Sequence, residues 1–120
     1  DMKQAKMPGR KIEKDDIKEM IRKTIAHNDL AIFIKGTPEQ PLCGFSARVV
    51  DILDGLKVNY KAVNIFDDIN IKPRLAEMTG WPTTPQVFIK GKLIGGADIT
   101  QEMYMNGELQ KMLKEANILA

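Results

Sequence analysis

The segment Leu30–Ser46 reads LAIFIKGTPEQPLCGFS. It opens with an apolar run from Leu30 to Ile34, and a run of this length is typical of a buried strand. A glycine and two prolines follow and predict a loop, and from Ser46 onward apolar residues recur at helical spacing. The segment therefore predicts a strand, a loop and a helix in succession, with Cys43 at the junction of the loop and the helix.

The rest of the chain continues this alternation of helices and strands. The other expected elements are a helix with Ile17, Met20, Ile21 and Ile25 that ends near His27-Asn28, an alternating strand through Val58, Tyr60 and Ala62, a short helix through Leu75 and Met78 that stops at Gly80, a hairpin of Gln86–Ile89 and Lys92–Ile94 around Lys90-Gly91, and helical structure from Asp98 with a break at Gly107. This order predicts an α/β fold, in which a four-stranded mixed β-sheet is flanked by helices on both faces.

The length and charge of the chain limit what it can be. Its 120 residues suit one domain. We expect a flexible N-terminal tail over residues 1–14, because its start is basic, polar and aperiodic, and a single domain over residues 15–120. The 18 basic and 16 acidic residues are interspersed and leave a net charge of +2, which argues against nucleic-acid and membrane binding. No apolar run approaches the roughly 20 residues that span a bilayer.

Cys43 is the only cysteine, so no internal disulfide can form. A cysteine at a helix N-terminus meets free N–H groups and a positive dipole end, and both favour the thiolate that attacks disulfides and binds metals. Lys35 and Arg48 add positive charge nearby in sequence, and Gly44 allows a ligand to approach the backbone. The alternative is that Cys43 is a small buried apolar residue. The loop and helix around it favour a reactive thiol.

Two further motifs have features that suit ligand binding. Pro82–Gln86 is a constrained turn before a strand, in which a cis bond at Pro85 is possible and Thr84 could offer its backbone to an extended peptide; the alternative is an ordinary rigid turn. Gly95–Asp98 joins a strand to a helix, where glycines permit close approach and a helix N-terminus suits a carboxylate. We also expect Asp98 to be an N-cap. Trp81 is interpreted as a packing residue.

Together these segments resemble the monothiol glutaredoxins of the thioredoxin superfamily. The resemblance rests on four motifs that occur in order at family spacing and covers roughly Asp16 to Leu113. They are Lys35–Ser46 with its Cys43-Gly44-Phe45-Ser46, Trp81–Gln86, Gly95–Ile99, and Glu102-Met103-Tyr104 followed by Gly107-Glu108-Leu109. The resemblance implies a thioredoxin-like fold.

The resemblance also implies a glutathione site. Lys35 and Lys72 would pair with the glycyl carboxylate of glutathione, although each is by default a solvated lysine. Lys72 stands where arginine is common, so the charge is kept and the bidentate fork is lost. The other expected contacts are the backbone of Thr84, held by a cis Pro85, for the cysteinyl portion, the backbone of Ala97 and side chain of Asp98 for the γ-glutamyl end, and Cys43, Gly44 and Phe45 beside the glutathione sulfur.

Counting thiols narrows the expected chemistry. Many relatives carry a second cysteine where this chain has Ala97, and dithiol glutaredoxins carry one where it has Ser46. A dithiol disulfide-reductase cycle is therefore excluded. A two-iron two-sulfur (2Fe–2S) cluster usually needs four ligands. The resemblance implies that Cys43 from each of two chains and two glutathione thiols supply them, in a cluster-bridged homodimer.

Three functions are compatible with these features. The first is a carrier that binds glutathione and a 2Fe–2S cluster and acts in iron–sulfur cluster assembly, transfer to apoprotein clients and redox homeostasis. The second is a glutathione-dependent oxidoreductase that removes glutathione from proteins by a monothiol route, and the third is an interaction module without a cofactor. Relatives also pair with BolA-type proteins. The lone cysteine is consistent with the reducing cytoplasm, and mitochondrion and plastid, after removal of a transit peptide, are alternatives.

Overall fold

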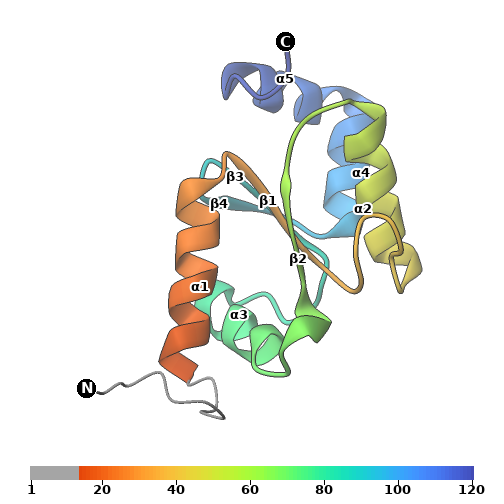
Figure 1. Cartoon of the computed structure of the whole chain (residues 1–120). Helices are drawn as coiled ribbons and strands as arrows, with labels where there is room; N and C mark the ends of the chain where they lie inside the picture. The colour runs from red at the N-terminus through yellow and green to blue at the C-terminus, as the bar shows by residue number, and fades with distance from the viewer. Residues whose placement is uncertain (1–13) are drawn as a thin grey trace.

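The computed structural model describes residues 14–120. The expected tail lies outside this range, except for Lys14, which is the first residue of α1. The elements are α1 (Lys14–His27), β1 (Leu30–Ile34), α2 (Gly44–Gly55), β2 (Lys61–Asn64), the 3-10 turn η1 (Ile65–Asp67), α3 (Ile71–Thr79), β3 (Gln86–Ile89), β4 (Lys92–Gly95), α4 (Ala97–Asn106) and α5 (Glu108–Glu115). This is the predicted order, with the last helical stretch divided in two (Figure 1).

The four strands form one sheet in the order β2-β1-β3-β4. β1 pairs with β2 in parallel and with β3 in antiparallel orientation, and β3 and β4 are antiparallel. The parallel pair is connected through α2, and the antiparallel pair β3–β4 is a hairpin. The predicted mixed sheet is therefore confirmed.

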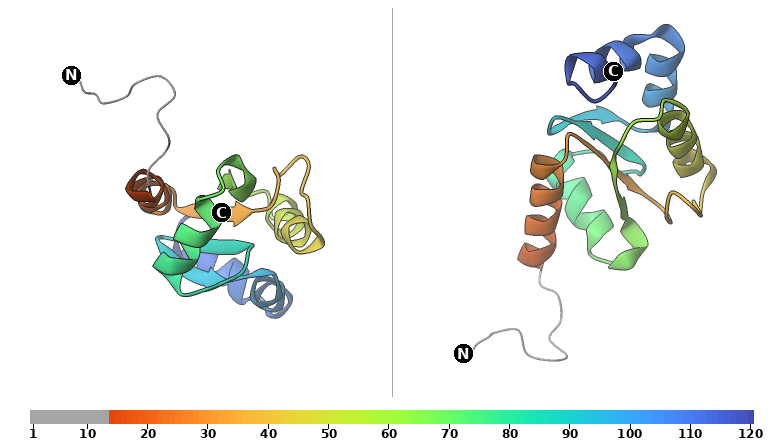
Figure 2. Two further views of the ribbon diagram at one scale, coloured as in Figure 1. Left: turned by 90° about the horizontal axis from the view of Figure 1, so that it is seen from below. Right: turned by 45° about the horizontal axis from the view of Figure 1, so that its top comes forward.

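Helices cover both faces of the sheet, as predicted (Figures 1 and 2). Leu30, Ile32 and Ile34 of β1 belong to one core with residues of α2, α4 and α5. The alternate residues Ala31 and Phe33 belong to a second core with residues of α1 and α3. Because both faces are covered, every residue of β1 is buried, which explains its uninterrupted apolar sequence.

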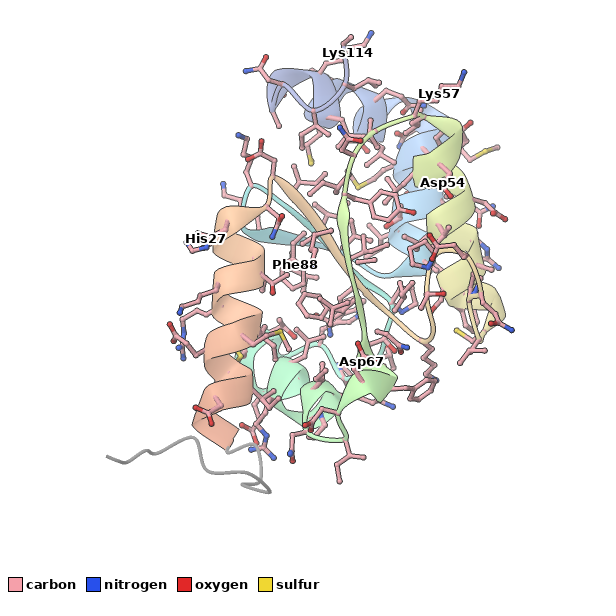
Figure 3. The ribbon with its side chains drawn as sticks, in the orientation of Figure 1. His27, Asp54, Lys57, Asp67, Phe88 and Lys114 are labelled. Atoms are coloured by element: carbon pink, nitrogen blue, oxygen red, sulfur yellow. The ribbon has the colours of Figure 1, made fainter. Side chains whose placement is uncertain are left out.

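The core between the sheet and α1 contains an aromatic pair. Phe33 and Phe88 meet edge to face, with ring centroids 5.7 Å apart, and Phe88 lies between the sheet and α1 (Figure 3). None of the helices within residues 14–120 has the length and apolar character needed to cross a bilayer.

The second strand begins later than its sequence pattern predicts. The alternation of Val58, Tyr60 and Ala62 indicates a strand, but β2 starts only at Lys61. Its pairing with β1 begins where Lys61 lies opposite Ala31, so earlier residues have almost no strand to pair with. The N–H of Val58 still bonds to the carbonyl of Leu53 in α2. Burial of Val58 therefore produces the apolar alternation before the strand has begun.

The ends of two helices and the hairpin turn lie at the residues that the sequence predicts. α3 ends at Gly80 and α4 at Gly107, both in the left-handed conformation, and Lys90-Gly91 forms the hairpin turn with positive φ at both residues. The expected N-cap role of Asp98 is wrong. Gly96 is the N-cap of α4, and Asp98 lies inside the first turn.

Candidate functional site

Cys43 is the N-cap residue of α2. Its backbone is extended (φ −153°, ψ 156°), and its Sγ accepts a hydrogen bond from the Ser46 N–H at 3.3 Å. This is the geometry in which an N-cap side chain satisfies a free N–H of the first helical turn. The thiol is partly exposed, so it combines a polar setting with access from solvent. The alternative that Cys43 is only a small buried apolar residue does not hold.

The loop before Cys43 is closed by backbone contacts. The N–H of Leu42 donates to the carbonyl of Lys35 at 2.8 Å, and Gly36 and Pro41 form an isolated bridge. Gly36 has φ +92°, and a Cβ there would lie 2.5 Å from the carbonyl oxygen of Gln40. Only glycine fits this position. The loop therefore returns the chain to the end of β1 and delivers Cys43 there.

The Ser46 side chain links Cys43 to the strand. Ser46 is fully buried, and its Oγ accepts a hydrogen bond from the Lys35 N–H at 3.0 Å and lies 3.3 Å from Cys43 Sγ. Since the Lys35 N–H already occupies an acceptor position, the hydroxyl proton can point to the sulfur when Cys43 is ionised. The residue that stands in place of a second thiol thus accepts a hydrogen bond from the neutral Cys43 thiol and can donate one to the thiolate.

These contacts favour the thiolate. Partial burial alone would raise the pKa of the Cys43 thiol, but hydrogen bonds from the Ser46 hydroxyl and from the N–H groups of Ser46 and Phe45 lower it, as does the charge of Lys35. The lowering effects outweigh burial, so the pKa lies below its ordinary value. Lys35 acts as expected. Arg48 does not, because its guanidinium pairs with Asp98 instead.

A cavity of about 540 Å³ is lined by Lys35 and Phe45, two of the residues that lower the pKa of Cys43. It collects residues that are far apart in the sequence, from the end of β1, the starts of α2, α3 and α4, and the turn before β3. Its lining residues are Lys35, Phe45, Lys72, Trp81, Thr83, Thr84, Pro85, Gly96, Ala97, Asp98 and Ile99. We refer to this cavity as the thiol-side pocket. Seven of the expected binding residues line it, whereas Cys43 and Gly44 do not line it and directly precede the lining residue Phe45 in the chain.

Two lysines give the pocket positive charge. Lys35 follows β1, and Lys72 stands in the first turn of α3. Within residues 14–120, neither side chain forms an ion pair or a hydrogen bond. Both ammonium groups are therefore available to an anionic ligand.

The turn before β3 presents free backbone to the same pocket. The Thr84–Pro85 peptide bond is cis. Over the described part of the chain, the N–H and carbonyl of Thr84 make no hydrogen bond. Gln86 holds the turn in place, because its buried Nε2 donates to the carbonyls of Trp81 and Thr83 at 2.9 and 3.1 Å. The turn is thus rigid and also has an unused edge, so both interpretations of the sequence apply.

Close packing requires glycine where this turn meets α4. A Cβ at Gly96 would lie 3.2 Å from the carbonyl oxygen of Pro85 and 3.5 Å from Nε1 of Trp81. Trp81 therefore packs against Gly96, as expected, and it also lines the pocket. The close approach that the sequence indicates is made first by the chain itself. At Gly44, by contrast, a Cβ would meet no atom of the described residues within 4 Å.

The sequence analysis did not identify two residues that hold parts of the site in place. Gln86 is a buried polar residue at the head of an apolar strand, a signal that could have identified it. Asn64 accepts hydrogen bonds through Oδ1 from the N–H groups of Gly36 and Phe66, at 3.0 and 2.9 Å, and so ties the Cys43 loop to η1. Nothing local in the sequence marks Asn64 for this role.

Known proteins resemble this chain in sequence and in structure. The glutaredoxin family model matches residues 30–94, more than half of the chain. The chain is 48% identical over 96 residues to a protein of Rickettsia felis named probable monothiol glutaredoxin 2, and the match covers 80% of this chain and 92% of that protein.

Two solved structures are also similar. Buckwheat glutaredoxin, crystallised as a complex with glutathione, has a TM-score of 0.79 and 30% identity, and the match covers 89% of this chain and 96% of that one. Reduced apo GrxS14 from poplar has a TM-score of 0.75 and 39% identity, and the match covers 85% of this chain and 94% of that one. With 30% and 39% identity, the likeness to these two structures includes the sequence as well as the fold.

Proposed function

The chain belongs to the glutaredoxin family, in its monothiol branch, and from this premise we propose that it binds glutathione beside Cys43 and holds and hands on a 2Fe–2S cluster. The observation that supports this proposal most strongly is the placement of one activated thiol beside a pocket with free lysines on one side and a carboxylate on another. Glutathione is a tripeptide with two carboxylates, one ammonium and one thiol. Each of these groups has a partner of suitable chemistry in the pocket or, for the thiol, in the nearby Cys43.

We assign the ligand as follows. The glycyl carboxylate pairs with Lys35 and Lys72, and the cysteinyl backbone pairs with the free N–H and carbonyl of Thr84 beside Pro85. The γ-glutamyl end meets the Ala97 backbone and the Asp98 carboxylate in the first turn of α4. The glutathione sulfur then lies near Cys43, with Gly44 and Phe45 at the mouth of the pocket. Buckwheat glutaredoxin, which was crystallised with glutathione, supports a ligand of this class.

The residues present fit a shared cluster and do not fit a cluster held by one chain. Over residues 14–120, no group of three or more His, Cys, Asp or Glu side chains could hold a metal ion. The chain thus offers one thiolate, and four ligands result when two chains each contribute Cys43 and one bound glutathione. A cluster held in this way is cargo at an exposed site, which suits its transfer to apo iron–sulfur client proteins.

Reconstitution of the cluster under anaerobic conditions tests the proposal. We expect cluster absorbance, one 2Fe–2S unit per two chains, a dependence on added glutathione, and conversion of a mainly monomeric apo protein into a dimer. Iron and sulfide analysis together with light scattering after size exclusion would measure this. A cluster that forms on a monomer, or without glutathione, would refute the shared-ligand arrangement.

The lowered pKa of Cys43 also favours a second function. In a monothiol route, the Cys43 thiolate attacks the glutathione sulfur of a glutathionylated protein, so that the protein thiol leaves and a Cys43–glutathione disulfide forms. A second glutathione then attacks this disulfide, which releases oxidised glutathione and restores the Cys43 thiolate. A glutathione-coupled reduction assay measures this activity. An interaction module without a cofactor would fail both this assay and the reconstitution.

The expected setting of the protein remains part of the proposal. We place it in the cytoplasm, with mitochondrion and plastid as alternatives, because a lone cysteine is consistent with a reducing compartment. Client apoproteins and a BolA-type protein are the proposed macromolecular partners. The balanced charge gives no reason to expect nucleic acid or a membrane among them.

A further inference from the structure

Arg48 stands beside the thiol-side pocket without a role in the site described so far. It extends from α2 toward α4, where its Nη1 lies 3.2 Å from Asp98 Oδ1. Its guanidinium carbon also lies 5.5 Å from the centre of the Phe45 ring. Both neighbours line the pocket, so Arg48 adds a cation to the side on which Asp98 supplies an anion.

The pair with Asp98 is poorly suited to a structural role. The Arg48 side chain is 39% exposed and that of Asp98 is 89% exposed. Exposed ion pairs contribute little to stability, because water screens the charges and two side chains must be ordered. A role in ligand binding explains better why the two charges stand together at the edge of a pocket.

Both side chains keep unused bonding capacity. A guanidinium has five N–H donors and a carboxylate has two acceptor oxygens, and among residues 14–120 only Nη1 and Oδ1 are engaged in hydrogen bonding here. In the described part of the chain, neither side chain has another ion-pair or hydrogen-bond partner. The pair can therefore accept a ligand that carries both charges without first breaking apart.

We propose that Arg48 binds the α-carboxylate of the γ-glutamyl residue while Asp98 binds its α-ammonium. This inference rests on the proposed glutathione site. A γ-linked glutamyl residue keeps both α groups free on one carbon, so it presents an ammonium and a carboxylate side by side. The ion pair of Arg48 and Asp98 presents the opposite charges side by side, and it thereby selects ligands with a free α-amino acid end.

Lys35 and Lys72 are assigned to the glycyl carboxylate, so the α-carboxylate of the γ-glutamyl residue is available to Arg48. Lys72 belongs to α3, whose core residues pack on one face of the sheet, whereas Asp98 and Arg48 belong to α4 and α2, which pack on the other face. The two carboxylates of glutathione are at opposite ends of the tripeptide. One end thus suits the lysines, and the other suits Arg48.

Titrations with two peptides test the assignment on the full chain. The probes are reduced glutathione and 4-aminobutyryl-cysteinylglycine, which lacks only the α-carboxylate. NMR shifts in a non-thiol reductant at low salt give a Kd for wild type, Arg48→Gln and Arg48→Lys. Arg22→Gln is the matched control, because Arg22 is an exposed helical arginine that pairs with Glu19 on α1, on the other face of the sheet.

We expect Arg48→Gln to weaken glutathione binding about three- to five-fold and to leave the Kd of the shortened peptide unchanged. Arg48→Lys should recover part of the loss, and Arg22→Gln should change neither Kd. An equal loss for both probes would overturn the assignment, because Arg48 would then only orient Asp98 and Phe45. Tighter glutathione binding in Arg48→Gln would also overturn it, since Arg48 would then compete with the ligand ammonium. If wild type bound neither probe, the glutathione site itself would fail.

Discussion

The thiol and the thiol-side pocket are built in different ways. Every contact that lowers the pKa of Cys43 comes from Lys35 or from the two residues Phe45 and Ser46, so the thiolate depends on one strand end, one loop and one helical turn. The pocket is lined by residues spread from 35 to 99, and it exists only when the whole sheet and its helices have assembled. We therefore expect mutations to separate the two. Changes in the pocket away from Lys35 should leave the reactivity of Cys43 unchanged, and changes at the thiol should leave glutathione binding in the pocket unchanged.

Replacing the thiol should cause the largest change. Cys43→Ser should abolish cluster binding, because no other cysteine exists to supply a ligand. The fold should remain, since serine is a favoured N-cap and can accept the same hydrogen bond from the Ser46 N–H. Iron content after reconstitution and thermal melting measure the two effects. Iron retained at the wild-type level would show that the cluster ligand lies elsewhere.

Removing the support of the pocket should have the next largest effect. Gln86→Leu keeps the volume but loses both hydrogen bonds to the turn before β3. If the turn shifts, the two backbone bonds of Thr84 to the ligand are lost, at roughly 1 kcal/mol each, which weakens glutathione binding about thirty-fold. The pH profile of Cys43 alkylation should stay unchanged.

Gln110→Leu is the control for this variant. Gln110 also donates through Nε2 to a backbone carbonyl, that of Tyr104, and like Gln86 it has an Oε1 without a partner among residues 14–120, but it does not line the pocket. Both variants should lose some thermal stability, and only Gln86→Leu should lose glutathione affinity. An altered alkylation profile in Gln86→Leu would mean that the thiol and the pocket are coupled after all.

The lysines test the pocket by charge. Lys35→Ala and Lys72→Ala should each weaken glutathione binding about ten-fold at low salt, because a well-placed charge-assisted bond is worth roughly 1.5 kcal/mol or more. Added salt should reduce the difference. Lys111→Ala, which removes an exposed lysine of α5, is the control.

A modified ligand sharpens this test. Glutathione esterified at its glycyl carboxylate lacks the group assigned to the lysines, so it should bind wild type and both variants equally. Lys35→Ala should also shift Cys43 reactivity toward higher pH, since the Lys35 charge lowers the pKa of that thiol, whereas Lys72→Ala should not. If wild type, Lys35→Ala, Lys72→Ala and the control Lys111→Ala all bound glutathione equally, Lys35 and Lys72 would be only solvated lysines.

The two regions also differ in how far the sequence predicts them. The strand β1, the loop and the thiol at the head of α2 follow from contiguous residues, because a buried strand must be apolar and an N-cap must precede the first helical turn. The turn at Lys90-Gly91 and the break at Gly107 follow in the same way from residues that tolerate positive φ. The sequence alone indicates Lys35, the Thr84-Pro85 turn and the Gly95–Asp98 segment, but their common ligand came from the family resemblance, and only the structure brings them together in one pocket.

The features for which the sequence prediction was wrong depend on contacts between residues that are far apart in the chain. The start of β2 is set by its register against β1, some 30 positions away along the chain. Arg48 was expected near Cys43, yet it pairs with Asp98, 50 residues further on. No local pattern specifies which of several nearby groups a long side chain reaches. Such contacts decide the ligand chemistry of the pocket, and they required the folded structure.

The smallest expected effect comes from the Ser46 hydroxyl. Ser46→Ala removes a hydrogen-bond donor to the Cys43 thiolate, so the pKa of the thiol should rise toward its ordinary value. The rate of alkylation by iodoacetamide should then follow the same curve shifted to higher pH. Thr100→Val is the control, because it removes another buried hydroxyl, one that lies in α4 and has no hydrogen-bond partner in the described part of the chain.

The same change should alter how stability depends on pH. A thiol whose pKa is lower in the folded than in the unfolded state contributes stability that is fully present above the unfolded pKa and is lost as the pH falls through the folded pKa. The free energy of unfolding of wild type should therefore rise with pH across that interval, and Ser46→Ala should flatten the rise while glutathione affinity in the pocket persists. An unshifted alkylation curve would mean that the N–H groups of Phe45 and Ser46 and the charge of Lys35 hold the thiolate without the hydroxyl.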